Sequence, residues 1–539
     1  MRTSSICSRV AACTLGISLS WTNSIGQDIK GGASNLNATD ISGGANVLLA
    51  NAEVEAKLGK GIFTPAQSKP HAIKPLEKSI LPRSSVKAAH TVSTQTAGNR
   101  SGRQSGRVSG TATTASNSGN KSTNRSTDLS GPALGGAPRR ALTAEDYNQQ
   151  GDGYFDAGNF DKAAEAYQQA VRLKPDFAEA YLNLGETYFN LSRYDEAIAA
   201  DKEAIALKPD WAEAYRTLGT TYLKTSRSAE ALEALKKAYK LDSNDAETRS
   251  ALGLAYFDHG VAAYNVKQYA EAIAAYQQAV ALKSGYFEAY NNLGDASRAS
   301  GKLKEAADAY KQAVAIKPDL LETYSNLSQV YDSLGKYPEA ADAYKQVIRL
   351  KPDDAEANNN MGYALGKSKR WQEALVAFQR AIQLKPDYAE AYSNLGWAYN
   401  NLGNYTAAVD PLKKAIQLKP SLPEGHFNLG LSYFHLRQNN EALAEFQQTI
   451  QLKADWPAAQ NNLGVAYGSL GNWKAALAAH QEAVRQNPSY GGAIYNLGVD
   501  YWKIGDKKSA TEQYEKLRTL NPNNAKALYE LIYRKPAPN

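Results

Sequence analysis

The residue types that most often carry chemistry are few in this chain and do not stand at catalytic or metal-binding spacing. Six histidines and two cysteines occur in 539 residues, and no histidine is paired with another histidine or a cysteine at the separation of metal ligands. The sequence has no phosphate-binding glycine loop, HExxH motif or nucleophile elbow. We therefore expect no catalytic residue, no metal site and no cofactor, and we predict that the protein is not an enzyme.

Carboxylates recur at regular spacing and do not form clusters. Seven glutamates each stand near the start of a predicted helix, where an anion complements the positive end of the helix dipole. They are Glu179, Glu213, Glu247, Glu322, Glu356, Glu390 and Glu424. Their position at helix starts is enough to explain why these glutamates recur, and a catalytic role is not required.

Asparagine supplies a series with a binding role. Each amide offers a carbonyl acceptor and an NH₂ donor, which match the N–H and C=O groups of an extended peptide backbone. The asparagines at this place are Asn183, Asn292, Asn326, Asn360, Asn394, Asn428, Asn462 and Asn496, and the last seven follow one another without a gap. A row of this kind can hold a peptide without selecting its sequence.

Each asparagine stands two residues before a place that recurs every 34 residues, with one slip of seven. Glycine occupies this place in all but one case, where Ser328 replaces it. The glycines are Gly151, Gly185, Gly219 and Gly253, then Gly260, Gly294, Gly362, Gly396, Gly430, Gly464 and Gly498. A period of this length predicts stacked supersecondary units in place of one globular core.

Each repeat is predicted to contain two amphipathic helices. Around the glycine, aromatic and leucine residues share one helix face, as in 392–399. Twelve residues later an alanine stands in every repeat, followed after four by a bulky residue such as Tyr167. We expect the glycine to meet this alanine where the helices approach closely. His426 and His480 take bulky places and are expected to be packed repeat residues.

This pattern resembles the tetratricopeptide repeat (TPR) family over about 144–524. The resemblance implies an all-α fold, an α-solenoid in which eleven helical hairpins form a right-handed superhelix with a concave face for proteins or peptides. In such superhelices the asparagine place faces the groove. The series is similar to the asparagine ladder in the TPR arm of O-linked N-acetylglucosamine transferases.

We therefore expect the eight asparagines, with Trp397, to be groove-exposed residues that bind an extended peptide. Tyr363 and Gln329 take the same place as Trp397, one residue after the glycine place, and complete an aromatic patch for an apolar side chain. Two alternatives remain open: the asparagines are ancestral to the repeat, and the aromatic residues are half-buried parts of the helix surface. A basic clamp for a C-terminal carboxylate, found in chaperone-binding members of the family, is not expected, because Arg216 stands alone among the basic places.

Departures from the pattern divide the array. The fourth repeat (246–286) is 41 residues long, which predicts a first helix lengthened by about two turns. It separates repeats 1–3 (144–245) from repeats 5–11 (287–524). Residues 525–539 are predicted to form a capping helix and tail, because Ile532 stands at the glycine place.

The first 143 residues have a different composition. Residues 1–26 resemble a secretory signal peptide and contain both cysteines, Cys7 and Cys13. Residues 27–143 are rich in Ser, Thr and Gly and are predicted to be disordered. Residues 1–143 hold 17 basic and 6 acidic side chains, so this region is either a solvated linker or an arm for weak polyanion contact. No apolar run is long enough for a membrane span.

These features predict a non-enzymatic scaffold, exported from a bacterium into the periplasm or beyond, that binds extended segments of partner proteins. One alternative is a substrate-selecting arm that acts with a separate O-GlcNAc-type glycosyltransferase. Another is a cytoplasmic adaptor whose basic tail binds nucleic acid. The sequence predicts neither the partner nor the oligomeric state.

Overall fold

The computed structural model describes residues 140–533, and all regular structure in this range is helical, with 23 helices and no strand. The predicted α-solenoid of helical hairpins is confirmed. The predicted signal peptide, nearly all of the predicted disordered region and residues 534–539 lie outside the described residues. The described chain divides into two compact bodies. The N-terminal body comprises 140–266 and 277–284, and the C-terminal body comprises 267–276 and 285–533.

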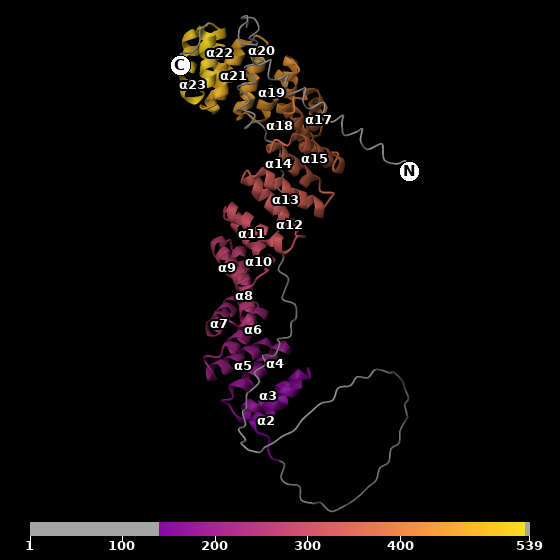
Figure 1. Cartoon of the computed structure of the whole chain (residues 1–539), viewed down its shortest axis with the longest axis vertical. Coiled ribbons are helices and arrows are strands. Elements are labelled where there is room, and N and C mark those ends of the chain that lie inside the picture. Colours follow the sequence, from indigo (N-terminus) through magenta and orange to yellow (C-terminus); the bar gives the residue numbers. More distant parts are fainter. Residues whose placement is uncertain (1–139, 534–539) are drawn as a thin grey trace, which may run out of the picture. The chain divides into compact units, whose positions relative to one another are not determined.

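The N-terminal body alternates a first and a second helix in each repeat (Figure 1). Its helices are α2 (Ala144–Asp156), α3 (Phe160–Leu173), α4 (Ala178–Asn190), α5 (Tyr194–Leu207), α6 (Ala212–Lys224), α7 (Ser228–Leu241) and α8 (Ala246–Asn265). Helix α9 (Tyr269–Leu282) has residues in both bodies.

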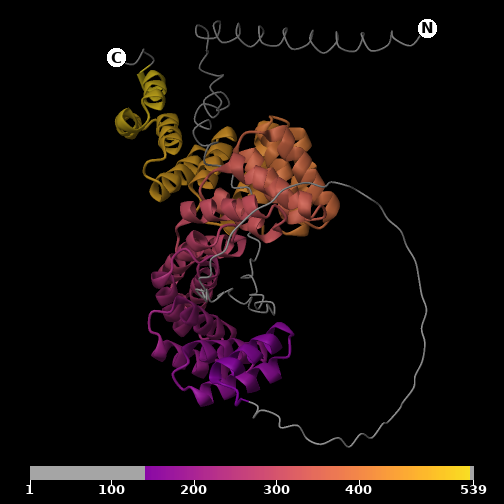
Figure 2. The ribbon, with the colours of Figure 1, turned by 60° about the horizontal axis from the view of Figure 1, so that its bottom comes forward.

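The C-terminal body continues the same alternation, and Figure 2 shows its successive helices from a second side. Its helices are α10 (Phe287–Ala299), α11 (Leu303–Ile316), α12 (Leu321–Ser333), α13 (Tyr337–Leu350), α14 (Ala355–Lys367), α15 (Trp371–Leu384), α16 (Ala389–Asn401), α17 (Tyr405–Leu418), α18 (Pro423–His435), α19 (Asn439–Leu452), α20 (Pro457–Ser469), α21 (Trp473–Gln486), α22 (Gly491–Lys503), α23 (Lys507–Leu520) and α24 (Pro522–Tyr533).

A single left-handed residue turns the chain from the first helix of a repeat into the second. Glycine suits this conformation because it lacks a Cβ, as at Gly403 with φ 74°. Five of these turns use another residue at φ between 59° and 64°: Ser192, Ser226, Lys267, Lys369 and Arg437. These five turns carry a backbone cost that the glycine turns avoid.

The repeating glycine makes room for a large side chain of the second helix. A Cβ added to Gly362 would lie 2.6 Å from Cε1 of Phe378, and one added to Gly151 would lie 2.5 Å from Cε1 of Tyr167. The expectation that the glycine meets the alanine holds for the Ala197 carbonyl, 3.4 Å from a Cβ added to Gly185, but the alanine is not the closest contact. The side chain four residues beyond the alanine takes up the space.

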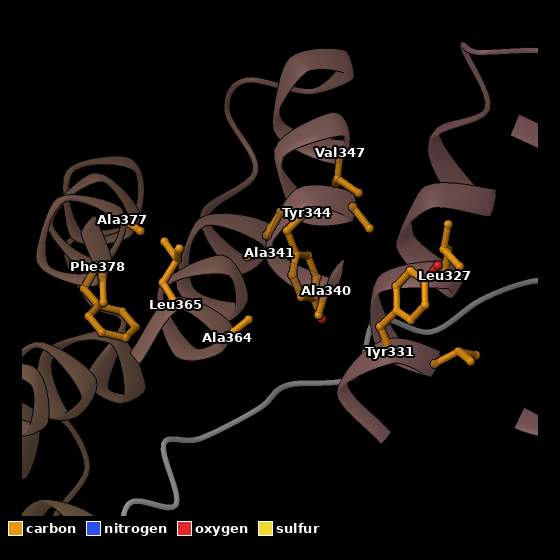
Figure 3. Packing of buried hydrophobic residues seen from close by; sticks show 14 of the residues in the cluster. Leu327, Tyr331, Ala340, Ala341, Tyr344, Val347, Ala364, Leu365, Ala377 and Phe378 are labelled. Carbon is orange, nitrogen blue, oxygen red and sulfur yellow. The ribbon is translucent and has the colours of Figure 1, made fainter. Parts of the chain in front are cut away.

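The alanines of the second helices form the remainder of the packed interior. Ala340 and Ala374 have no exposed surface, and the rings of Tyr344 and Phe378 beside them are 3% and 0% exposed. Figure 3 shows Ala340 and Tyr344 of α13, Leu365 of α14 and Phe378 of α15, which belong to one buried cluster. Neighbouring hairpins bury one another's apolar faces, which is how a repeat array is stabilised.

The two departures from the repeat pattern are visible in the helices. Helix α8 has 20 residues where the other first helices have 13, so the prediction of a lengthened first helix is confirmed. Helix α24 buries Leu528 and Ile532 against α22 and α23. Leu528 meets Gly498, so this helix packs on the last repeat as a cap is expected to do.

Candidate peptide-binding surface

The predicted asparagines lie on one stripe of the first helices, but most of them are buried. In α14 the stripe contains Asn360, Tyr363 and Lys367, which are three and four residues apart and so share one helix face. Only Asn183 and Asn292 are half-buried. The other six are 1–8% exposed: Asn326, Asn360, Asn394, Asn428, Asn462 and Asn496. The expectation that all of them are exposed is therefore wrong for these six.

Burial is possible because amide groups of neighbouring repeats bind one another. Asn394 Nδ2 donates to Asn359 Oδ1 at 2.9 Å, and Asn496 Nδ2 donates to Asn461 Oδ1 at 2.9 Å. In the N-terminal body Asn183 makes the corresponding bond of 3.2 Å. Each bond joins residues 35 positions apart, so the series links successive first helices.

The residues that accept these bonds were missed in the sequence. They are Asn148, Asn359 and Asn461, each three residues before the glycine place. The adjacent pairs 359–360 and 461–462 were an available signal, because two neighbouring amides can face two different repeats.

Repeats 5 and 6 are joined by a larger buried network. Asp295 Oδ1 accepts from the Tyr310 hydroxyl at 2.6 Å and from Asn326 Nδ2 at 3.2 Å. Thr323 donates to Asn291 Oδ1 at 2.7 Å. Burial, followed by the charge of Asp295, raises the pKa of the Tyr310 hydroxyl. This proton therefore stays on Tyr310 and holds the carboxylate of Asp295 in place.

Trp397 is buried, at 5% exposure, and lies in a row of aromatic rings. Its ring centroid is 4.9 Å from that of Trp371 and 6.0 Å from that of Tyr363, which is 6.3 Å from Tyr337. We call Tyr337, Tyr363, Trp371 and Trp397 the aromatic row. The first three are half-buried and Gln329 is buried, so the accessible part of the predicted patch is Tyr363 with its two neighbours.

Both repeat histidines are packed, as expected. His426 Nδ1 lies 2.6 Å from Glu445 Oε2 and its Nε2 lies 3.0 Å from the Pro420 carbonyl. Burial alone lowers the pKa of His426, but the hydrogen bonds to Glu445 and Pro420 outweigh burial and raise it above its usual value. His480 lies 2.5 Å from Asp500 and is 2% exposed.

Two glutamates in the first turns of first helices, Glu145 and Glu390, pair with a lysine in addition to any interaction with the helix dipole. Lys174 Nζ lies 3.0 Å from Glu145, and Lys419 Nζ lies 2.7 Å from Glu390. Each lysine follows its second helix and reaches back 29 residues to the start of the first helix in the same repeat. These pairs are exposed or partly exposed and contribute little to stability.

Arg216, which stands alone among the basic places of the groove, lies among three carboxylates in the N-terminal body. Arg216 is 3% exposed, and its guanidinium lies 2.8 Å from Glu247 and 3.5 Å from both Glu213 and Asp245. Three carboxylates thus neutralise it. This agrees with the expectation that it forms no clamp for a C-terminal carboxylate.

Asp201 is a second buried ionisable group of the N-terminal body. It occupies the bulky place of its repeat, meets Gly185 and is 0% exposed. Burial raises the pKa of its carboxyl well above the usual value, and Glu186 adds to this. A carboxyl at a place taken elsewhere by rings was the available signal.

Within residues 140–533, no group of histidine, cysteine and acidic side chains has the arrangement of a metal site. No helix in this range combines the length and apolar character required to cross a bilayer.

The hairpins, the glycine contact and the first-helix stripe define a tetratricopeptide array, a class of protein-interaction scaffold. The chain belongs to the tetratricopeptide repeat family. Family profiles described as tetratricopeptide repeat match residues 148–211, 257–320, 353–421, 427–491 and 492–524, and a TPR repeat profile matches 227–260 and 329–369.

Solved structures similar to this chain include three proteins. Cut9–Hcn1, an APC/C hetero-tetramer, is 15% identical over 73% of this chain and 97% of its own, with a TM-score of 0.39. Yeast Tom70 is 15% identical over 72% and 95%, with a TM-score of 0.35. MamA is 30% identical over 31% and 92%, with a TM-score of 0.30. No curated protein matches the sequence.

Proposed function

We propose that the array is a non-enzymatic scaffold that binds an extended segment of a partner protein along the first-helix stripe of the C-terminal body. The observation that carries the proposal is the half-buried Tyr363, which stands between Asn360 and Lys367 on the stripe of α14. Aromatic side chains held by neighbouring rings are the usual anchors of protein interfaces.

The asparagines have two roles in this proposal. Seven of them lie along the path in the C-terminal body: Asn292, Asn326, Asn360, Asn394, Asn428, Asn462 and Asn496. The bonds that Asn394 and Asn496 donate to Asn359 and Asn461 keep that path rigid, and Asn183 makes the corresponding bond within the N-terminal body. A rigid receptor loses little conformational entropy when it binds. Trp397 contributes to this site by packing against the ring of Tyr363, which fixes the position of that ring.

The test is selection of a random library of displayed 12-residue peptides on the full chain, followed by hydrogen-exchange mapping of the peptides that bind. We expect protection on α12, α14 and α16. Tyr363→Ala is expected to weaken binding by about tenfold or more, the effect of losing an aromatic anchor.

Val376→Ala is the matched control, because Val376 is 66% exposed on the second helix α15. It removes a similar apolar contact from the other helix of the same repeat and is expected to leave binding unchanged. Failure to enrich any peptide, or protection confined to second helices, contradicts the proposal.

A further inference from the structure

Lys367 is a half-buried cation to which the described part of the chain, residues 140–533, supplies no acidic partner. It lies in the last turn of α14, and its Nζ is 5.5 Å from the centroid of the Tyr337 ring. Burial lowers the pKa of its ammonium group. Among residues 140–533 no carboxylate lies within ion-pair distance of Lys367, whereas Lys351 and Lys419 each have one.

The ring of Tyr337 explains where the ammonium group lies but does not neutralise it. The same contact recurs in the last repeat, where Lys503 Nζ lies 5.2 Å from the Trp473 ring. A cation over a ring at an exposed site gains far less free energy than a cation beside a buried counter-charge. Lys367 is thus positioned by Tyr337 and keeps its positive charge available.

The acidic groups beside the aromatic row, Asp332 and Glu373, each have a partner of their own, although Oδ1 of Asp332 accepts no hydrogen bond from the described residues. Asp332 Oδ2 accepts from the Tyr344 hydroxyl at 2.8 Å. Burial raises the pKa of Asp332 to about 7 against the lowering effect of that bond, so its charge is reduced near neutral pH. Glu373, in the first turn of α15, is paired with Arg370, with 2.7 Å between Glu373 Oε2 and Arg370 Nη2. Lys367 is therefore a half-buried cation beside Tyr363 to which the described residues supply no opposite charge, and Lys369 is an exposed cation two residues further on.

We propose that Lys367 and the aromatic row select partner segments in which a large apolar side chain stands next to an aspartate or glutamate. The apolar side chain packs on Tyr363 between Tyr337 and Trp371, and the acidic group pairs with the ammonium of Lys367. The inference rests on the proposed peptide-binding function and adds the chemistry of the partner. The chain's own N-terminal 143 residues do not match it, since basic residues outnumber acidic ones there by 17 to 6.

The experiment compares peptide selections on the full-length wild type and on Lys367→Met, which keeps the apolar stem and removes the charge. We expect wild-type peptides to combine an aromatic or large aliphatic residue with a neighbouring acid. Lys367→Met is expected to retain the apolar preference and lose the acidic one. Wild-type-selected peptides should bind the variant on the order of tenfold to a hundredfold more weakly, the usual effect of losing a charged hydrogen-bond partner.

Lys369→Met is the matched control, because it also removes a lysine charge, but from an exposed turn two residues after Lys367. It is expected to leave the acidic preference intact. Enrichment of the same acidic motif by Lys367→Met, or of basic residues by the wild type, overturns the inference and leaves the scaffold proposal standing. Selection of no peptide by the wild type overturns both.

Discussion

The contact between the repeating glycine and the second helix can be tested at Gly362. Gly362→Ala places a Cβ 2.6 Å from the Phe378 ring, closer than carbon atoms approach without movement. Overpacking of a core costs about 1–3 kcal/mol, while alanine gains about 1 kcal/mol over glycine within a helix. The expected net effect is a destabilisation of about 0–2 kcal/mol.

Gly153→Ala is the control that isolates the contact. Gly153 also lies within a first helix, α2, but a Cβ there would have no atom within 4 Å. This variant is expected to stabilise α2 by about 1 kcal/mol. Because the helix-propensity gain is common to both, the difference of about 1–3 kcal/mol between the variants reports the ring contact.

Hydrogen exchange is the appropriate assay, since long repeat arrays do not unfold in one cooperative step. Exchange protection is compared with wild type in α14 and α15 for Gly362→Ala, and in α2 and α3 for Gly153→Ala. A difference of 1.4 kcal/mol corresponds to about a tenfold change in the opening constant. Equal gains in protection for both variants would refute the reasoning.

The repeat with Ser328 shows how such a contact can relax. There the Tyr344 hydroxyl donates to Asp332, four residues after the glycine place. In the repeat with Gly294, the Tyr310 hydroxyl donates to Asp295, one residue after it. A ring beside a Cβ can therefore take another direction when a new hydrogen-bond partner exists, and Phe378, which has no hydroxyl, lacks this option.

Three further predictions concern stability. The pKa of His426 in the folded protein is raised above its usual value of 6.5, so its stabilising contribution is full below pH 6.5 and is lost as pH rises through the folded pKa. Exchange protection of α18 and α19 should fall across that range in wild type and depend less on pH in His426→Phe. Lys369→Gly relieves a φ of 61° and is expected to stabilise the α14–α15 hairpin by about 0.5–1 kcal/mol. Gly403→Ala, at the same turn of the next repeat, should destabilise the α16–α17 hairpin by a similar amount. The two variants must change the free energy of unfolding, measured by hydrogen exchange, in opposite directions. Asn394→Ala removes the hydrogen bond to Asn359 at a site that is 1% exposed, and it should cost about 1–3 kcal/mol in the exchange protection of α14 and α16. Asn292→Ala, at a half-buried site, should cost less. Equal costs for the two variants would contradict the view that the buried asparagines link successive repeats.

Much of the fold was predictable because it depends on short-range spacing. The glycine place, the alanine twelve residues later and the bulky residue beyond it lie within one hairpin, so their order along the chain determines which helices form and how they pair. The length of α8 followed from the seven-residue slip for the same reason. The error about the glycine contact arose because the sequence shows which residues face each other but not which of them reaches across.

The burial of the asparagine side chains was not predictable from one repeat, since their hydrogen-bond partners lie 35 residues away. A polar residue on a helix face is normally expected to face solvent, and it is buried only when a second polar group forms a hydrogen bond with it. Asn394 and Asn359 meet this condition between two repeats, as do Asp295 and Asn326. The same reasoning points to Lys367, a half-buried polar group to which no described residue supplies an opposite charge. Asn394 and Asn359 satisfy each other within the chain. At Lys367 an acidic group of a bound partner would play the corresponding role.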